Sequence, residues 1–139
     1  MRIDELVGRL TPEELERPGL TPDGWSVKDL MSHVAAWSEY TADVLGEMAT
    51  GTWDGRDAFA EPGSVDRLNR EWFERFRESD LEVVRSAWGE SRARLLGSLG
   101  ALREITPEAG EWFEETGPAH YVEHLPDLVA WSERLRSDL

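Results

Sequence analysis

Apolar residues recur every three or four positions along most of this chain, and no stretch alternates with the two-residue period of a β-strand. The pattern predicts helices and no sheet. The clearest helix follows Ser26, a typical capping residue with Asp29 in the first turn, and it ends at Gly51. Its apolar positions, from Val27 to Met48, follow the helical period and indicate one buried face.

Two short helical segments are expected before this helix. Ile3 to Leu10 is amphipathic. Thr11 then precedes Pro12 and Glu14, which is the pattern of a threonine cap, a proline in the first turn and a glutamate at the third position. The Arg-Pro-Gly run at 17–19 ends this second segment.

A third helical segment begins at Ser64, the expected cap, and repeats apolar residues such as Leu68 and Trp72 at helical spacing. The Ser-Asp-Leu-Glu run at 79–82 is another helix-start signal, so the helix should break or kink there before it continues to Leu99. The prediction is one long, bent third helix.

Two stretches are expected to be loops. Residues 52–63 are rich in glycine, proline and mixed polarity, and a loop of this length either rims a site or is plain surface. Residues 103–117 form the second loop. The last helix starts near Pro118 and carries Pro126 inside its apolar pattern, which predicts a kink after His124.

Amphipathic helical segments joined by loops, without strands, favour an all-α fold. We expect a four-helix bundle with a shortened first helix, and a single domain over residues 1–139. Bundles of this kind build metal and cofactor sites from inward side chains on facing helices.

Charge and composition narrow the class of partner. The chain has 15 lysines and arginines against 29 aspartates and glutamates, a formal net charge of −14 at pH 7. A phosphate backbone requires basic surface, so we expect no nucleic-acid partner. No apolar run approaches the length of a membrane span, and residues 1–5 carry no leader signal, so we expect a cytoplasmic protein with no membrane partner. Cysteine is absent, and any metal must therefore be held by nitrogen and oxygen.

All three histidines fall on apolar faces of predicted helices. His120 and His124 are four residues apart, so their rings share one helix face and can coordinate one ion. His33, on another helix, could add a third nitrogen and leave coordination positions open, which is the mark of a catalytic metal site. The alternative is three unrelated histidines within the core.

Three further residues are candidates for binding a small-molecule substrate. Trp37 follows His33 by one turn, and Tyr121 adjoins His120, so both could line a cavity beside the metal. Tryptophans at helical spacing are more often core residues. Asn69 is a polar residue next to an apolar one in the first turn of its helix, and it fits either a pocket hydrogen bond or the surface.

Two motifs carry a family resemblance. The run Gly24-Trp-Ser-Val-Lys-Asp-Leu-Met-Ser-His-Val-Ala-Ala-Trp37 and the run His120-Tyr-Val-Glu-His-Leu125 resemble the DinB-like superfamily of four-helix bundles. That group includes mycothiol-dependent maleylpyruvate isomerases, bacillithiol S-transferases and a colibactin self-resistance branch. Residues 66–69 and 91–96 are similar to the second half of that last branch. The likeness covers nearly the whole chain.

The resemblance implies a divalent metal, nickel or zinc in many members, held by one histidine of the second helix and two of the fourth. By matching motif, these are His33, His120 and His124. It also implies that a low-molecular-weight thiol is a possible cosubstrate. The chain departs from the family at its first helix, which is two or three turns shorter than usual. Either a partner chain completes the bundle, which favours a homodimer, or the start given for the chain is late.

Two function classes follow. The first is a metal-dependent enzyme that acts on a small electrophile by thiol transfer, hydrolysis or isomerisation. The second is a binding or sequestering protein, such as a self-resistance protein, that uses the same cavity without turnover. No catalytic side chain can be named, because all three histidines are taken as metal ligands.

Overall fold

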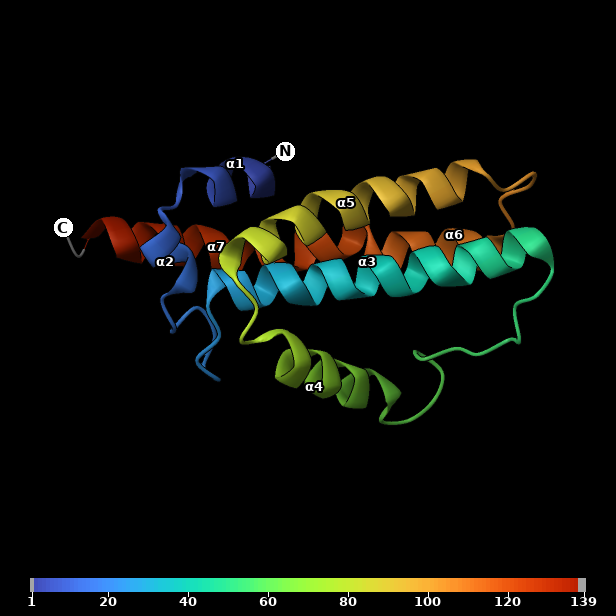
Figure 1. Ribbon diagram of the computed structural model, residues 1–139, viewed down its shortest axis with the longest axis horizontal. Coiled ribbons are helices and arrows are strands. Elements are labelled where there is room, and N and C mark those ends of the chain that lie inside the picture. The colour runs from blue at the N-terminus through green and yellow to red at the C-terminus, as the bar shows by residue number, and fades with distance from the viewer. Residues whose placement is uncertain (1, 138–139) are drawn as a thin grey trace.

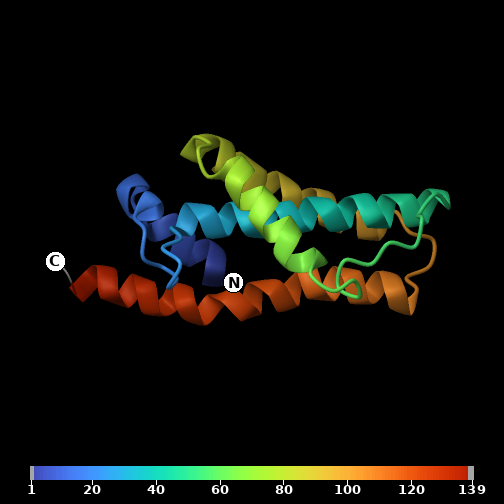
Figure 2. The same ribbon diagram turned by 90° about the horizontal axis from the view of Figure 1, so that it is seen from below.

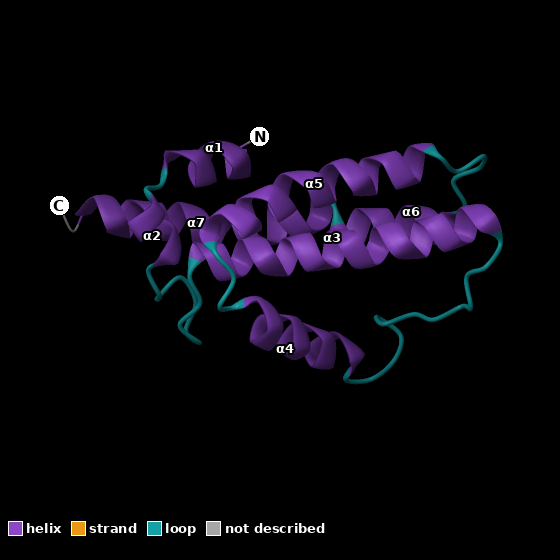
Figure 3. Ribbon diagram, in the orientation of Figure 1, coloured by secondary structure: helices purple, strands orange, loops and turns teal. Residues whose placement is uncertain are grey.

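The computed structural model describes residues 2–137, and every regular element in that range is a helix. Figure 3 shows these helices and their connecting loops. The all-α helical bundle is confirmed. The helices are α1 (Arg2–Arg9), α2 (Pro12–Glu16), α3 (Val27–Thr50), α4 (Ser64–Phe76), α5 (Leu81–Gly100), α6 (Pro107–Thr116) and α7 (Pro118–Ser137).

Three long rods form the body of the bundle. α3 packs lengthwise against α5, and α6 and α7 follow one another nearly end to end as the third rod (Figure 1). The short α1 lies against α7, and α2 lies against α3. Figure 2 shows that α4 crosses α3 obliquely instead of running along it. α4 is therefore a cover on one side of the bundle.

Both ends of α3 are where the sequence predicts them. The Ser26 hydroxyl accepts a hydrogen bond from the Asp29 N–H at 3.1 Å, and the Asp29 carboxylate accepts one from the Ser26 N–H at 2.9 Å. At the other end, Gly51 has a φ of 73°, a left-handed conformation that favours glycine. Between these caps, Val34 and Leu45 are fully buried, so the register of the inward face is set by the caps and the apolar period together.

The predicted long, bent helix is two separate helices. Residues 77–80 form a turn, and α5 begins after Asp80, whose side chain makes no capping hydrogen bond. The Ser79 hydroxyl does not cap the helix either. Instead, the Ser79 carbonyl accepts a hydrogen bond from Lys28 Nζ at 2.9 Å, which ties the turn to the start of α3. The break allows α4 to take a direction of its own.

The start of α4 also differs from the prediction. The capping position is Gly63, with a φ of 79°, and not Ser64. The Ser64 hydroxyl donates to the Glu61 carboxylate at 2.9 Å instead. The left-handed backbone conformation at this corner favours glycine, because glycine has no Cβ. α4 therefore begins without a side-chain cap.

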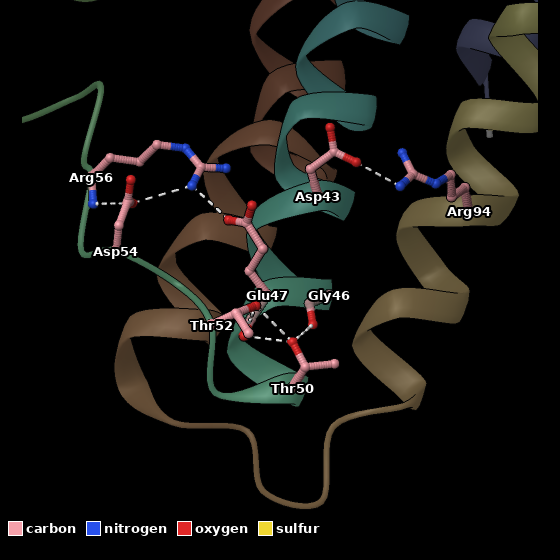
Figure 4. A network of polar contacts seen from close by, with 8 residues as sticks. All are labelled: Asp43, Gly46, Glu47, Thr50, Thr52, Asp54, Arg56 and Arg94. Carbon is pink, nitrogen blue, oxygen red and sulfur yellow. Dashed lines mark hydrogen bonds and ion pairs between the residues drawn. The ribbon is translucent and has the colours of Figure 1, made fainter.

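The loop before α4 is held to the end of α3 by ion pairs (Figure 4). Arg56 Nη1 donates to Glu47 at 2.5 Å and to Asp54 at 3.2 Å. On the neighbouring face, Arg94 of α5 pairs with Asp43 at 2.6 Å. The Arg56–Glu47 pair ties the loop to α3, whereas the Arg94–Asp43 pair joins α5 to α3.

The second predicted loop is wrong from Pro107 onward, because residues 107–116 are helical. The Thr106 hydroxyl caps α6 by accepting from the Ala109 N–H at 3.1 Å, and Pro107 occupies the first turn. Gly117 separates α6 from α7. A Cβ at Gly117 would lie 2.7 Å from the Phe113 carbonyl oxygen, so only glycine fits this junction without a shift.

α7 runs across Pro126 without a break, so His120 and His124 stay in one helix, as a shared metal site requires. Across residues 2–137, no helix combines the length and apolar character that crossing a membrane demands.

Candidate metal centre

Three histidine side chains from two helices meet inside the bundle. His33 belongs to α3, and His120 and His124 belong to α7. His33 Nε2 lies 3.1 Å from His120 Nε2, and one ring nitrogen of each residue lies within 4.8 Å of the other two. The cluster that the sequence predicts is therefore formed in space, and these side chains can hold one metal ion.

Local sequence accounts for the direction of each ring. His120 and His124 are one turn apart, so both project from the same face of α7, and their ring centroids lie 4.7 Å apart. His33 lies seven residues after the Ser26 cap and next to the fully buried Val34. Because the cap sets the register of α3, it also sets the side of the helix from which His33 projects.

Burial keeps the three imidazoles neutral. It lowers the pKa of His33 from 6.5 to about 3, with a further contribution from the charges that His120 and His124 would carry. It lowers the pKa of His120 to about 4, with His124 as the second cause. The pKa of His124 is lowered by burial too, while the carboxylates of Glu123 and Asp127 act in the opposite direction. Neutral imidazole is the form that binds metal, so the fold prepares these nitrogens as ligands.

The residues fit a divalent ion on two counts. First, two nitrogens that each lie ~2.0–2.1 Å from one ion are separated by about 2.9–3.4 Å at tetrahedral or octahedral angles, and the observed 3.1 Å between His33 and His120 falls in that range. Second, His124 Nε2 is buried and has no hydrogen-bond partner among the described residues. An unpartnered buried nitrogen costs free energy unless something binds it. Imidazole ligands suit zinc and nickel.

The histidines line an open cavity of about 330 Å³. Aromatic and polar side chains both contribute to its walls. The lining also includes Trp25, Trp37, Phe59, Val65, Asn69, Glu115, Thr116 and Glu123. α4 supplies Val65 and Asn69, so the helix that crosses the bundle obliquely covers one side of this cavity.

Two of the predicted substrate-binding residues meet in this cavity. Trp37 Nε1 donates a hydrogen bond to Asn69 Oδ1 at 2.8 Å, and this bond joins α3 to α4. Trp37 is buried, and its ring stacks on Phe59 at a centroid distance of 5.3 Å. Both residues therefore line the cavity that the histidines line.

Tyr121 lies elsewhere. Its hydroxyl accepts a hydrogen bond from Arg92 Nε at 3.2 Å, and its ring packs edge-on against Trp88 of α5. It lines a second cavity, between α5 and the α6–α7 rod, together with Arg92. Although Tyr121 is adjacent to His120 in sequence, successive residues point about 100° apart around a helix. The structure thus separates Tyr121 from the histidine cluster.

Some lining residues are absent from the sequence prediction of the site. Trp25 meets His33 edge-on at a centroid distance of 5.4 Å and stacks on Phe73 of α4 at 5.2 Å. Phe59 comes from a loop, and Glu115 comes from a segment expected to be a loop. Trp25 directly precedes the Ser26 cap and belongs to the same sequence motif as His33, and this shared motif could have indicated it. No periodic signal marks the other two.

One family of known proteins matches this chain. No curated protein and no solved structure matches the chain. A family model described as the mycothiol maleylpyruvate isomerase N-terminal domain matches residues 1–129. This family lies within the DinB-like superfamily, so the resemblance found in the sequence is confirmed. With nearly its whole length matched, the chain belongs to the mycothiol maleylpyruvate isomerase N-terminal domain family.

Proposed function

We propose that His33, His120 and His124 bind one divalent ion, zinc or nickel, and that the domain converts a small electrophile by thiol transfer, hydrolysis or isomerisation. The observation that carries this proposal is the convergence of three neutral ring nitrogens at an open cavity. A structural metal site is closed by four protein ligands, whereas a three-nitrogen site leaves positions for a reactant.

When bound, such an ion supplies Lewis-acid chemistry and lowers the pKa of a water or a thiol beside it. The protein contributes orientation and exclusion of water. Trp37 and Phe59 form an apolar wall that limits solvent on one side. Asn69 uses its side-chain oxygen to accept from Trp37, so its amide N–H groups are left to donate to a substrate.

A thiol cosubstrate would come from solution. The chain has no cysteine, so it cannot supply a thiol of its own. The name of the family includes mycothiol, a low-molecular-weight thiol. This supports thiol transfer as the first reaction to test.

We also propose that two copies of the chain associate. The second cavity, of about 520 Å³, is a groove lined mainly by apolar side chains, among them Ile3, Leu95 and Leu125. Leu96 and Val122 on its rim are 54% and 69% exposed. α1 contributes Ile3 to the lining but leaves Leu96 and Val122 exposed, and a second copy would remove these side chains from water.

The experiment uses protein purified without a polyhistidine tag. Elemental analysis should give about one zinc or nickel per chain, and each of His33→Ala, His120→Ala and His124→Ala should lower it strongly. A matched control is Glu133→Gln, a remote exposed position on α7. With metal, a low-molecular-weight thiol and an epoxide or halogenated compound, thiol should be consumed over many turnovers. Consumption that stops at one equivalent, or tight binding without consumption, would favour a sequestering protein instead.

A further inference from the structure

His33 lacks the usual means by which a metal-binding histidine is oriented. Such a histidine generally donates the N–H of its second ring nitrogen to a carbonyl or carboxylate group, which fixes the direction of the ring. Within residues 2–137, the hydrogen-bonding contact of His33 runs from Nε2 to His120, and none involves Nδ1. The packing of neighbouring side chains must therefore orient this ring.

Three rings pack around the His33 imidazole. His120 and His124 meet it edge-on at centroid distances of 4.9 and 5.4 Å. Trp25 meets it at 5.4 Å, with the two ring planes at 66°. The torsion that turns an imidazole about its Cβ–Cγ bond has broad preferences of its own, so neighbouring rings decide where the nitrogens point. Of the three, Trp25 is the one that is not itself a candidate ligand.

Trp25 is held both through its backbone and through its side chain. Its N–H donates to the Thr21 hydroxyl at 3.2 Å, and its carbonyl accepts from the N–H groups of Gly19 and Leu20 at 3.2 and 2.9 Å. Its ring stacks on Phe73 of α4 at 5.2 Å, with the planes 6° apart. A ring fixed in this way is a rigid wall beside His33.

We propose that Trp25 is a positioning residue of the metal centre, and that it holds the His33 ring with Nε2 directed at the ion shared with His120 and His124. The inference rests on the proposed function, because it assumes that the three histidines bind a divalent ion. Phe73 supports Trp25 from α4. The helix that covers the histidine cavity therefore also contributes to the orientation of a ligand.

The test measures zinc and cobalt(II) binding to the full chain, purified without a polyhistidine tag. Trp25→Leu removes the wall but keeps an apolar side chain. It should lower the affinity for zinc about ten- to hundredfold, as the loss of a group that orients a metal ligand typically does. The visible absorption of the cobalt-loaded protein, which depends on coordination geometry, should change too. Trp25→Phe keeps an aromatic ring at this position and should recover most of the affinity and the spectrum.

The matched control is Trp53→Leu, since Trp53 is also partly buried but lies outside the lining of the histidine cavity. This variant should keep the zinc affinity and the cobalt spectrum, even if its Tm falls as far as that of Trp25→Leu. Phe73→Leu removes the support behind Trp25 and should lower the zinc affinity in the same direction. It also provides the test if Trp25→Leu does not fold.

Unchanged zinc affinity and cobalt spectrum in Trp25→Leu would overturn the inference, as would the same result in Phe73→Leu if the first variant does not fold. So would an equal loss of affinity in Trp53→Leu, or a loss that Trp25→Phe does not recover. Failure of the proposed function has a different signature, because the unmodified protein would then bind no zinc, and the inference would fail with it. If the unmodified protein binds about one zinc per chain and Trp25→Leu binds it equally well, only the inference fails.

Discussion

His33 Nε2 lies 3.1 Å from His120 Nε2, although 87 positions separate them in the chain. In metal-free protein, two neutral rings at this distance share one hydrogen bond, with one nitrogen as donor and the other as acceptor. A metal ion would bind the lone pair of each nitrogen, and the hydrogen bond between the two rings would then be lost. Protonation of these rings, metal binding and the free energy of unfolding should therefore depend on one another in this protein.

The first prediction concerns the stability of the metal-free protein in acid. The folded pKa is about 3 for His33 and about 4 for His120, against 6.5 as the ordinary value. Below pH 6.5 the unfolded chain takes up protons that the folded chain does not, so the free energy of unfolding falls as pH drops from 6.5 towards these values. Each histidine contributes at most about 1.4 kcal/mol per pH unit in that window, and nothing further above it.

Denaturant unfolding at pH 7, 6 and 5 in the presence of a chelator measures this dependence. His33→Gln should lose less stability on acidification than the unmodified protein, because one buried titrating group is removed. The carboxylates of the chain also titrate, but they are common to both proteins. Parallel pH profiles would contradict the prediction.

The second prediction concerns Asn69. Replacement by alanine leaves the indole N–H of Trp37 without its acceptor and should lower the free energy of unfolding by about 1–3 kcal/mol. Asn69→Asp keeps an acceptor oxygen at this position and should recover most of the loss. Zinc stoichiometry should stay the same in both variants, since Asn69 is not one of the three histidines. Equal stability of the alanine and aspartate variants would argue against the hydrogen bond.

The third prediction concerns the junction of α6 and α7. Gly117→Ala places a Cβ 2.7 Å from the Phe113 carbonyl oxygen, so the junction must shift, at a cost of about 1–3 kcal/mol. Because His120 follows three residues later, the affinity for zinc should fall as well. Calorimetric titration with zinc and thermal unfolding measure the two effects.

The matched control for Gly117 is Gly89, which is exposed within α5 and has open space around it. Gly89→Ala should raise the free energy of unfolding by about 0.8–1 kcal/mol, because alanine is the better helix former. Zinc affinity should stay unchanged in this variant. A Gly117→Ala protein as stable as Gly89→Ala would show that the junction tolerates a side chain.

The fourth prediction concerns association. If a second copy covers the groove between α5 and the α6–α7 rod, Leu96→Glu and Val122→Glu should shift the mass measured by light scattering from dimer to monomer. Ile105→Glu is the control, since Ile105 is 57% exposed but lies outside the groove. A monomeric mass for the unmodified protein at micromolar concentration would remove the basis of the proposal.

Local signals in the sequence determine several features of this protein. The caps at Ser26 and Gly51 and the apolar period between them define α3, because capping and helical periodicity depend on residues within one or two turns. The spacing of His120 and His124 places both rings on one helix face for the same reason. The lack of cysteine excludes thiolate ligands and leaves the histidine nitrogens as the main candidates.

Tertiary structure decides what these elements bring together. Asn69 meets Trp37 only because the chain breaks at residues 77–80 and α4 crosses α3. The helical period turns Tyr121 away from His120, but tertiary packing decides that Trp88 lies on that side of α7. Phe59 reaches Trp37 from a loop without periodicity. Local periodicity specifies which face of a helix is apolar. The angle at which two helices cross, and the side chains that meet there, depend on contacts between residues far apart in the chain.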